Sequence, residues 1–150
     1  MTGPIVYTGG TFDLFHAGHV NFLRQCRRLA GPEGRVVVAL NSDEFIRDYK
    51  GQAPIISYRD RRSVLLACEY VDNVVVNSGG ADSKPSIQAV MPDIIAIGDD
   101  WAAKDYYAQM QFTQDWLDER GIVLAYVPYK RGISTTEIKA RMTKRSIIGR

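Results

Sequence analysis

Five short apolar runs recur along the chain, with longer segments of mixed polarity between them. They occupy residues 5–7, 36–40, 74–76, 94–97 and 123–127. The run 36–40 is apolar at every position rather than at every second one, which is typical of a strand covered on both faces. Strands that alternate with helices predict an α/β, Rossmann-like fold with a doubly wound, five-stranded parallel sheet and right-handed crossovers.

Helices are predicted between these runs from their periodicity and capping residues. They cover residues 17–30, 43–48, 58–70, 85–91 and 102–120, and a last helix begins at Ser134. Asn41-Ser42-Asp43 can cap the second helix, and Gly121 closes the long fifth one. The side chains predicted to face inward are Val20, Leu23 and Cys26 in the first helix and Val64, Leu65 and Cys68 in the third.

Residues 1–150 are predicted to form a single domain, with 143–150 as a basic C-terminal tail. The longest apolar runs have the length of strands, so no membrane-spanning segment is expected. The first four residues lead directly into the first strand, which leaves no room for a signal peptide. Cys26 and Cys68 lack C-x-x-C spacing and are expected to be small buried side chains. A cytoplasmic protein with no membrane partner is therefore expected.

The charge of the chain is nearly balanced, with a formal net charge of +2. A nucleic-acid-binding protein is expected to show a dense basic face with interleaved aromatics or a known reading motif, and neither is found in the sequence. No nucleic-acid partner is therefore predicted. Scattered basic clusters near the ends of strands suit small phosphorylated molecules better.

The turn after the first strand carries the strongest chemical signal. Gly9 and Gly10 permit close approach of a ligand, and His16 and His19 follow where a helix should begin. Side chains three residues apart share a helix face, beside an N-terminus that favours anions. These features predict a polyphosphate site whose imidazoles donate hydrogen bonds to the α- and β-phosphates and stabilise the charge that develops during reaction. No third ligand accompanies the pair, so no metal site is predicted there.

Three segments resemble motifs of one family. Residues 10–19, G-T-F-D-x-x-H-x-G-H, resemble the signature of small nucleotidyltransferases of the cytidylyltransferase type. Residues 132–136, G-I-S-T-T, resemble their second signature, and residues 98–101, G-D-D-W, resemble glycerol-3-phosphate cytidylyltransferases. The resemblance implies transfer of CMP from CTP to glycerol 3-phosphate, giving CDP-glycerol and pyrophosphate. It also implies Mg²⁺ bound to the triphosphate, and a homodimer.

The resemblance further implies roles for individual residues. The implied catalytic residues are His16, His19, Lys50 and Arg131, although the family's arginine falls on Tyr129 here and Arg131 reaches the phosphates from a shifted position. The implied nucleotide-binding residues are Gly9, Gly10, Thr11, Phe12, Gly18, Asp99, Gly132, Ile133, Ser134, Thr135 and Thr136. The implied acceptor-binding residues are Asp13, Lys50, Arg61, Lys84, Asp100 and Trp101. Asp13 could instead cap the first helix, and its capping preference favours that role.

Two alternatives remain open. Residues 41–54, which contain N-S-D-x-x-x-R-x-x-K-G, resemble a segment of heptose-phosphate adenylyltransferases, which would replace CTP by ATP and the acceptor by a sugar 1-phosphate. From another class, the chain could be a catalytically weak nucleotide-binding module with a regulatory role. Tyr129 and Glu69, which stand where the family usually has arginines, favour that second alternative. It predicts nucleotide binding without turnover.

Overall fold

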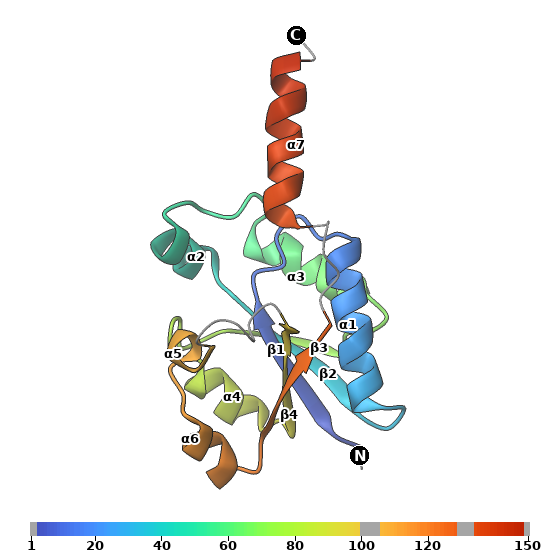
Figure 1. Cartoon of the computed structure of the whole chain (residues 1–150), viewed down its shortest axis with the longest axis vertical. Coiled ribbons are helices and arrows are strands. Elements are labelled where there is room, and N and C mark those ends of the chain that lie inside the picture. The colour runs from blue at the N-terminus through green and yellow to red at the C-terminus, as the bar shows by residue number, and fades with distance from the viewer. Residues whose placement is uncertain (1–2, 100–105, 129–133, 149–150) are drawn as a thin grey trace.

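A computed structural model describes residues 3–99, 106–128 and 134–148 of the chain. Its centre is a five-stranded parallel sheet with the strand order β3-β2-β1-β4-β5 (Figure 1). The strands are β1 (Ile5–Gly10), β2 (Arg35–Leu40), β3 (Asn73–Val76), β4 (Ile94–Gly98) and β5 (Val123–Val127). The predicted α/β, doubly wound fold is confirmed, and each predicted apolar run is part of a strand.

Helices cover both faces of the sheet. The helices in the described ranges are α1 (Ala17–Ala30), α2 (Asp43–Lys50), α3 (Tyr58–Ala67), α4 (Lys84–Val90), α5 (Tyr106–Met110), α6 (Gln114–Glu119) and α7 (Thr135–Ile148), and α1, α3, α4 and α6 are those that cover the sheet. One core layer joins α1 and α3 to β1 and β2 through Leu23, Leu65 and Val38. The opposite layer joins α4 and α6 to β1 and β4 through Ile87, Leu117 and Ile95. Because both faces are covered, β2 is apolar on both, as its unbroken run predicts.

The predicted long helix over residues 102–120 is wrong in its described part. The carbonyl of Met110, at the end of α5, accepts hydrogen bonds from the backbone N–H and the hydroxyl of Ser83 instead of continuing the helix. Gln111 then adopts a left-handed backbone with φ 59°, and Phe112 turns into the core. Thr113 caps α6, since its hydroxyl oxygen accepts the N–H of Trp116.

The third helix also differs from its prediction. It ends at Ala67, because Cys68 has an extended backbone, and its inward face consists of Arg61 and Leu65. Val64 was predicted to point inward but is 42% exposed, whereas Leu65 is buried as predicted and Cys68 is partly buried against the core. An arginine on that face concealed the pattern. In α1, by contrast, Leu23 and Cys26 are buried as predicted.

The last helix, α7, extends away from the sheet and ends near the C-terminus (Figure 1). It continues through Ile148, so residues 143–148 of the predicted tail are helical. No helix in the described ranges is both long and apolar enough to cross a bilayer.

Candidate active site

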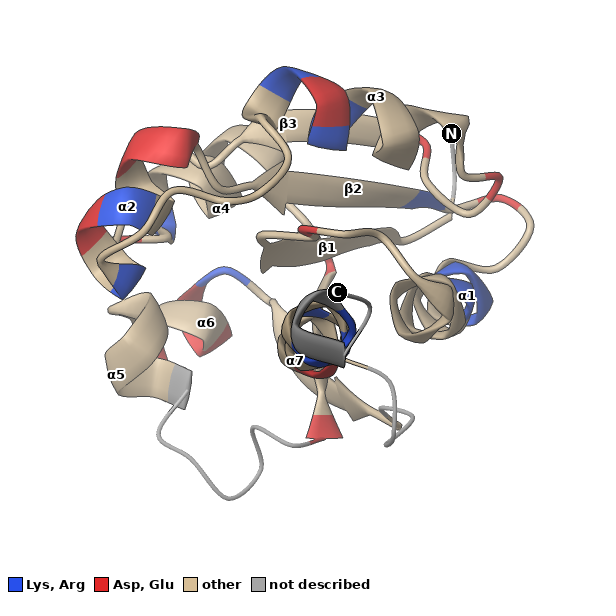
Figure 2. Cartoon of the chain, turned by 90° about the horizontal axis from the view of Figure 1, so that it is seen from above, with Lys and Arg blue, Asp and Glu red and all other residues tan. Residues whose placement is uncertain are grey.

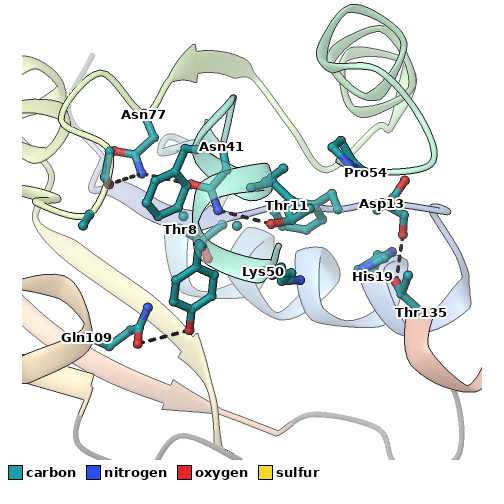
Figure 3. A pocket seen from close by; sticks show the side chains of 18 of the residues that line it. Thr8, Thr11, Asp13, His19, Asn41, Lys50, Pro54, Asn77, Gln109 and Thr135 are labelled. Carbon is teal, nitrogen blue, oxygen red and sulfur yellow. Dashed lines mark hydrogen bonds between the residues drawn. The ribbon is translucent and has the colours of Figure 1, made fainter. Parts of the chain in front are cut away.

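A pocket of about 490 Å³ opens at the carboxyl ends of the strands (Figure 3). Its floor is the end of β1 and the turn after it, and its walls come from α2, the loops after α2 and β3, the end of α5, and the start of α7. The chain leaves β1 for β2 on one side and reaches β4 on the other. The pocket therefore lies at the topological switch point of the sheet, where ligands of doubly wound proteins bind.

The two histidines hold each other in place at the start of α1. Nδ1 of His16, the N-cap residue, accepts the N–H of Gly18 at 3.0 Å, and Nδ1 of His19 accepts the N–H of His16 at 3.2 Å. This is the reciprocal arrangement of a capping box, with imidazoles replacing the usual hydroxyl and carboxylate. The rings stack with centroids 3.8 Å apart. His19 lines the pocket, whereas His16 lies beside it and is not one of its lining residues.

These contacts determine where the imidazole protons lie. Because each Nδ1 accepts a hydrogen bond, the proton of each neutral ring is on Nε2. Burial lowers the pKa of His19 to about 4, with a further lowering by His16 and a smaller opposing effect of Asp13. Burial also lowers the pKa of His16, whose Nε2 has no partner within the described ranges. At neutral pH the pair therefore supplies two N–H donors and no positive charge.

Gly9 and Gly10, before the histidines, differ in what a side chain at each position would contact. A Cβ on Gly10 would come within 2.8 Å of the Phe12 ring, so packing within the protein excludes a side chain there. A Cβ on Gly9 would meet nothing described closer than 3.8 Å. Gly9 lines the pocket, so the space above it is available to a ligand. Phe12 and Leu14 have left-handed backbones, with φ of 51° and 50°. Such backbone conformations are costly and concentrate at functional sites.

Asp13 organises the wall of the pocket and does not cap α1, so the capping interpretation is wrong. Its buried carboxylate accepts three backbone N–H groups, those of Leu14, Ile55 and Ile56, at 2.8 to 3.1 Å. The loop after α2 is thereby attached to the turn after β1. The backbone carbonyl of Asp13 also accepts a hydrogen bond from the Thr135 hydroxyl at 2.8 Å, which docks α7 on the same turn (Figure 3).

Among the described residues that line the pocket, two lysines carry positive charge. Lys50, at the end of α2, lines it and makes no hydrogen bond or ion pair with the described residues. Lys139 lines the opposite wall, with Nζ 3.8 Å from the Asp13 carboxylate. Sequence reasoning missed Lys139 as a site residue, although it lies four positions after Thr135 and therefore on the same helix face. Figure 2 shows acidic and basic positions together on α2 and α3, so neither helix presents charge of a single sign.

Arg61 and Lys84, two implied acceptor-binding residues, have other partners. The Arg61 side chain is fully buried and donates to the carbonyls of Ile56 and Thr11 and to the Asp43 carboxylate. Lys84 pairs with Asp82 at 2.9 Å and donates to the carbonyl of Gln111. Neither lines the pocket.

Of the remaining motif residues, some lie in the described ranges and others lie outside them. Ser134 caps α7 by accepting the N–H of Glu137, Thr135 lines the pocket, and Thr136 is exposed. Gly18 is buried in the first turn of α1, and Asp99 is exposed beyond Gly98, which does line the pocket. The residues of these motifs that lie outside the described ranges are Asp100, Trp101, Arg131, Gly132 and Ile133.

Two asparagines of the pocket were not predicted as site residues. Asn41 follows β2 directly and Asn77 follows β3 directly, and both line the pocket. In the sequence, Asn41 reads as part of a helix cap and Asn77 as part of a loop. The signal that could have identified them is their position, because a polar residue just after a buried parallel strand lies at the ligand-binding edge of the sheet.

Most of the chain matches a known protein family. The family model described as cytidylyltransferase-like matches residues 7–141. The chain belongs to the cytidylyltransferase-like family. It is therefore a nucleotidyltransferase, as the resemblance of its motifs implies.

The individual relatives of this family member differ from the enzyme that G-D-D-W implies. The chain is 37% identical to a FAD synthase of Pyrococcus horikoshii over 139 residues, which cover 93% of this chain and 92% of that protein. It is also 37% identical to the bifunctional protein HldE of Koribacter versatilis over 135 residues, 89% of this chain but only 26% of that protein. These relatives are FAD synthase and HldE rather than glycerol-3-phosphate cytidylyltransferase, so the implied similarity to the latter is not supported.

Solved structures share the fold of this cytidylyltransferase-like protein. A lipopolysaccharide core biosynthesis protein of Thermoplasma volcanium matches 85% of this chain and 99% of its own, with a TM-score of 0.67 and 25% identity. TmcAL of Thermotoga maritima, solved with alpha-thio ATP, has a TM-score of 0.64 at 13% identity and shows similarity of fold alone.

Proposed function

We propose that this protein is an adenylyltransferase, which transfers AMP from ATP to a phosphorylated acceptor and releases pyrophosphate. The observation that carries the proposal is the stacked pair of neutral imidazoles at the start of α1, beside the pocket. An oxygen of the acceptor phosphate attacks the α-phosphorus of ATP, and the bond from that phosphorus to the bridging oxygen of pyrophosphate breaks. The attacking phosphate is already ionised, so the protein mainly has to align two anions and stabilise developing charge.

Each part of the pocket has a role in this reaction. The Nε2–H groups of His16 and His19 donate to the α- and β-phosphates, where negative charge increases in the transition state. Lys50 and Lys139 neutralise the anions from opposite walls. The N-terminus of α7 suits the terminal phosphates, as the G-I-S-T-T resemblance implies. Arg131 remains a candidate for the same role.

The choice of ATP over CTP rests on the relatives. FAD consists of AMP joined to the phosphate of FMN, so a FAD synthase links those two parts. The resemblance of residues 41–54 to heptose-phosphate adenylyltransferases supports the same nucleotide. Both therefore favour adenylyl transfer over the CMP transfer implied by G-D-D-W.

We infer that FMN is the leading acceptor. The wall formed by α2 and the following loop presents Phe45, Ile46, Tyr49, Ala53 and Pro54 to the pocket. The rings of Phe45 and Tyr49 are nearly parallel, at 10°, with centroids 5.8 Å apart. A flat aromatic ring gains contact area on such a wall, whereas each sugar hydroxyl placed there would lose its hydrogen bonds to water. A sugar 1-phosphate stays the second candidate because of the similarity to HldE.

The described residues of the pocket do not form a metal site of their own. Among the described residues, no cluster of three or more His, Cys, Asp or Glu could hold a metal ion. The Asp13 carboxylate, which does line the pocket, already accepts three backbone N–H groups. We therefore expect Mg²⁺ to enter with the triphosphate.

The test is pyrophosphate release with Mg²⁺, with ATP and CTP each combined with FMN, a heptose 1-phosphate and glycerol 3-phosphate. ATP with FMN should give turnover, and His16→Ala should lower kcat by at least a hundredfold with little change in ATP affinity. Lys144→Ala, an exposed position of α7, is the matched control. Turnover only with CTP would overturn the proposal. ATP binding without turnover on any acceptor would favour the regulatory module.

A further inference from the structure

A row of hydrogen bonds crosses the edge of the sheet from α4 to the pocket. The Ser86 hydroxyl bonds Oδ1 of Asn77 at 2.9 Å, and Nδ2 of Asn77 bonds Oδ1 of Asn41 at 2.9 Å. Nδ2 of Asn41 then bonds the hydroxyl oxygen of Thr11 at 3.2 Å (Figure 3). The row joins the residues that follow β1, β2 and β3. We call it the Ser86–Thr11 relay.

Backbone groups determine the direction of this relay. Nδ2 of Asn77 also bonds the carbonyl of Gly80 at 3.0 Å. A carbonyl can only accept, so this end of the Asn77 amide must be its NH₂ group, and the Asn41 atom that it also bonds must be an oxygen. At the far end, Oδ1 of Asn77 faces the Ser86 hydroxyl and can only accept, so Ser86 donates its proton there while its oxygen accepts the N–H of Ser78 at 3.2 Å.

The direction of the relay determines which way the Thr11 hydroxyl can donate. Since Oδ1 of Asn41 faces Asn77, its NH₂ group faces Thr11, and the Thr11 hydroxyl oxygen must accept. The Thr11 proton is then free to point elsewhere, and within the described ranges no protein group accepts it. Thr11 lines the pocket. Donors arranged in one direction also polarise one another, which strengthens the last donor in the row.

We propose that the Ser86–Thr11 relay orients the Thr11 hydroxyl as a hydrogen-bond donor to a phosphoryl oxygen of the bound ligand, with Asn41 and Asn77 as positioning residues. The phosphoryl oxygen can belong to ATP or to the phosphorylated acceptor. This inference rests on the proposed function for the identity of the ligands, but not for the geometry of the relay. It explains why amides, rather than carboxylates, follow β2 and β3.

Reversing the relay tests the proposal. In Asn41→Asp, the new carboxylate can still accept from Asn77, but it also accepts the Thr11 proton and removes it from the pocket. This variant should weaken phosphate binding about ten- to a hundredfold, the range of a hydrogen bond to a charged group. Thr11→Val should give a similar loss. Asn73→Asp adds the same charge at the opposite end of β3 and should have no effect.

A double-mutant cycle separates the relay from simple charge repulsion. Dissociation constants for ATP and for FMN are measured separately by calorimetry in the wild type, Asn41→Asp, Thr11→Val and the double variant. If the relay acts through Thr11, Asn41→Asp costs at least threefold less in the Thr11→Val background. The titration that shows this coupling identifies the ligand that Thr11 contacts. Equal losses in both backgrounds, for both ligands, would overturn the relay.

Two further measurements separate failure of the relay from poor folding of a variant and from failure of the proposed function. Asn41→Ala carries no charge and should show a smaller loss with the same dependence on Thr11, which covers the case in which the aspartate variant folds poorly. Wild-type protein that binds ATP but shows no coupling refutes the relay and leaves the proposed function standing. Wild-type protein that binds neither ATP nor FMN refutes both.

Discussion

At the scale of single residues, the hydrogen bonds that start α1 also determine the chemistry of the pocket. Each imidazole uses Nδ1 to satisfy a backbone N–H that the first turn of a helix leaves without a partner. The cap therefore selects the tautomer, and burial keeps both rings neutral. A residue that could only cap, such as serine, would fold the helix but leave no N–H donor for a phosphate.

Histidine protonation provides a first prediction. Folding lowers the pKa of His19 from its ordinary 6.5 to about 4, so between these values the unfolded chain binds more protons. The stability that this contributes is fully present above pH 6.5 and falls as the pH drops toward 4. Proton NMR of the imidazoles, the only two in the chain, should place the His19 midpoint near 4. A midpoint near 6.5 would contradict the buried, neutral pair.

Gly9→Ala gives a second prediction at this scale. The new methyl group would meet no described atom closer than 3.8 Å, so the melting temperature should change by less than about 2 °C. Because the methyl occupies space in the pocket, ATP should bind at least tenfold more weakly. Calorimetric titration and thermal unfolding check the two parts. Normal ATP affinity would show that no ligand approaches the backbone there.

At the scale of elements, two buried charged groups hold the pocket wall together. Asp13 accepts N–H groups of the loop before α3, and Arg61 of α3 donates to that loop, to the turn after β1 and to α2. The turn after β1 is thus joined at two side chains to α2, to the loop before α3 and to α3 itself. The segment from Lys50 to Pro54 contributes to the pocket lining. Its C-terminal end is held in place because the next residue, Ile55, donates its N–H to the Asp13 carboxylate.

Arg61→Leu tests this structural role. It leaves the Asp43 carboxylate and two carbonyls without their partner, which should cost about 2–4 kcal/mol of unfolding free energy. Arg62→Leu, at the exposed neighbouring position, should cost less than about 0.5 kcal/mol. Urea unfolding of both variants makes the comparison. Unchanged stability with a raised KM for the acceptor would instead support the acceptor-binding role implied by the family motifs.

At the scale of the whole molecule, α7 stands out because it extends away from the sheet (Figure 1). Its first turn is docked through Thr135, but its described side chains from Lys139 to Arg145 are exposed, including Met142 at 56%. An isolated helix of this length is marginal in water, so most helices of 14 residues gain their stability from packing. A second copy of the chain would supply that packing.

We therefore expect a homodimer, as the family resemblance also implies. Light scattering coupled to size-exclusion chromatography should give about twice the 16.8 kDa of one chain. Met142→Asp should shift the equilibrium toward monomer, whereas Lys144→Asp, on another side of α7, should shift it less. A monomeric wild-type protein at micromolar concentration would contradict this expectation.

Local signals in the sequence were sufficient for much of the fold. Apolar runs predicted all five strands, most directly β2, which is buried on both faces, and capping residues predicted the start of α2. Where a tertiary contact replaced a local preference, prediction failed. Ser83 takes the carbonyl that would have continued α5, and an arginine replaces an apolar residue on the inner face of α3.

By itself, the sequence determined the strands, the doubly wound class and the histidine turn, because each depends on neighbours within a few residues. Only the tertiary structure decided that Asp13 holds a loop, that Arg61 is buried, and that Lys139 and the two asparagines line the pocket. These residues are as much as 126 positions apart from Asp13 to Lys139, and they meet at the ends of parallel strands. The order of strands across the sheet sets which of them become neighbours, and that order is a property of the packed chain rather than of any one segment.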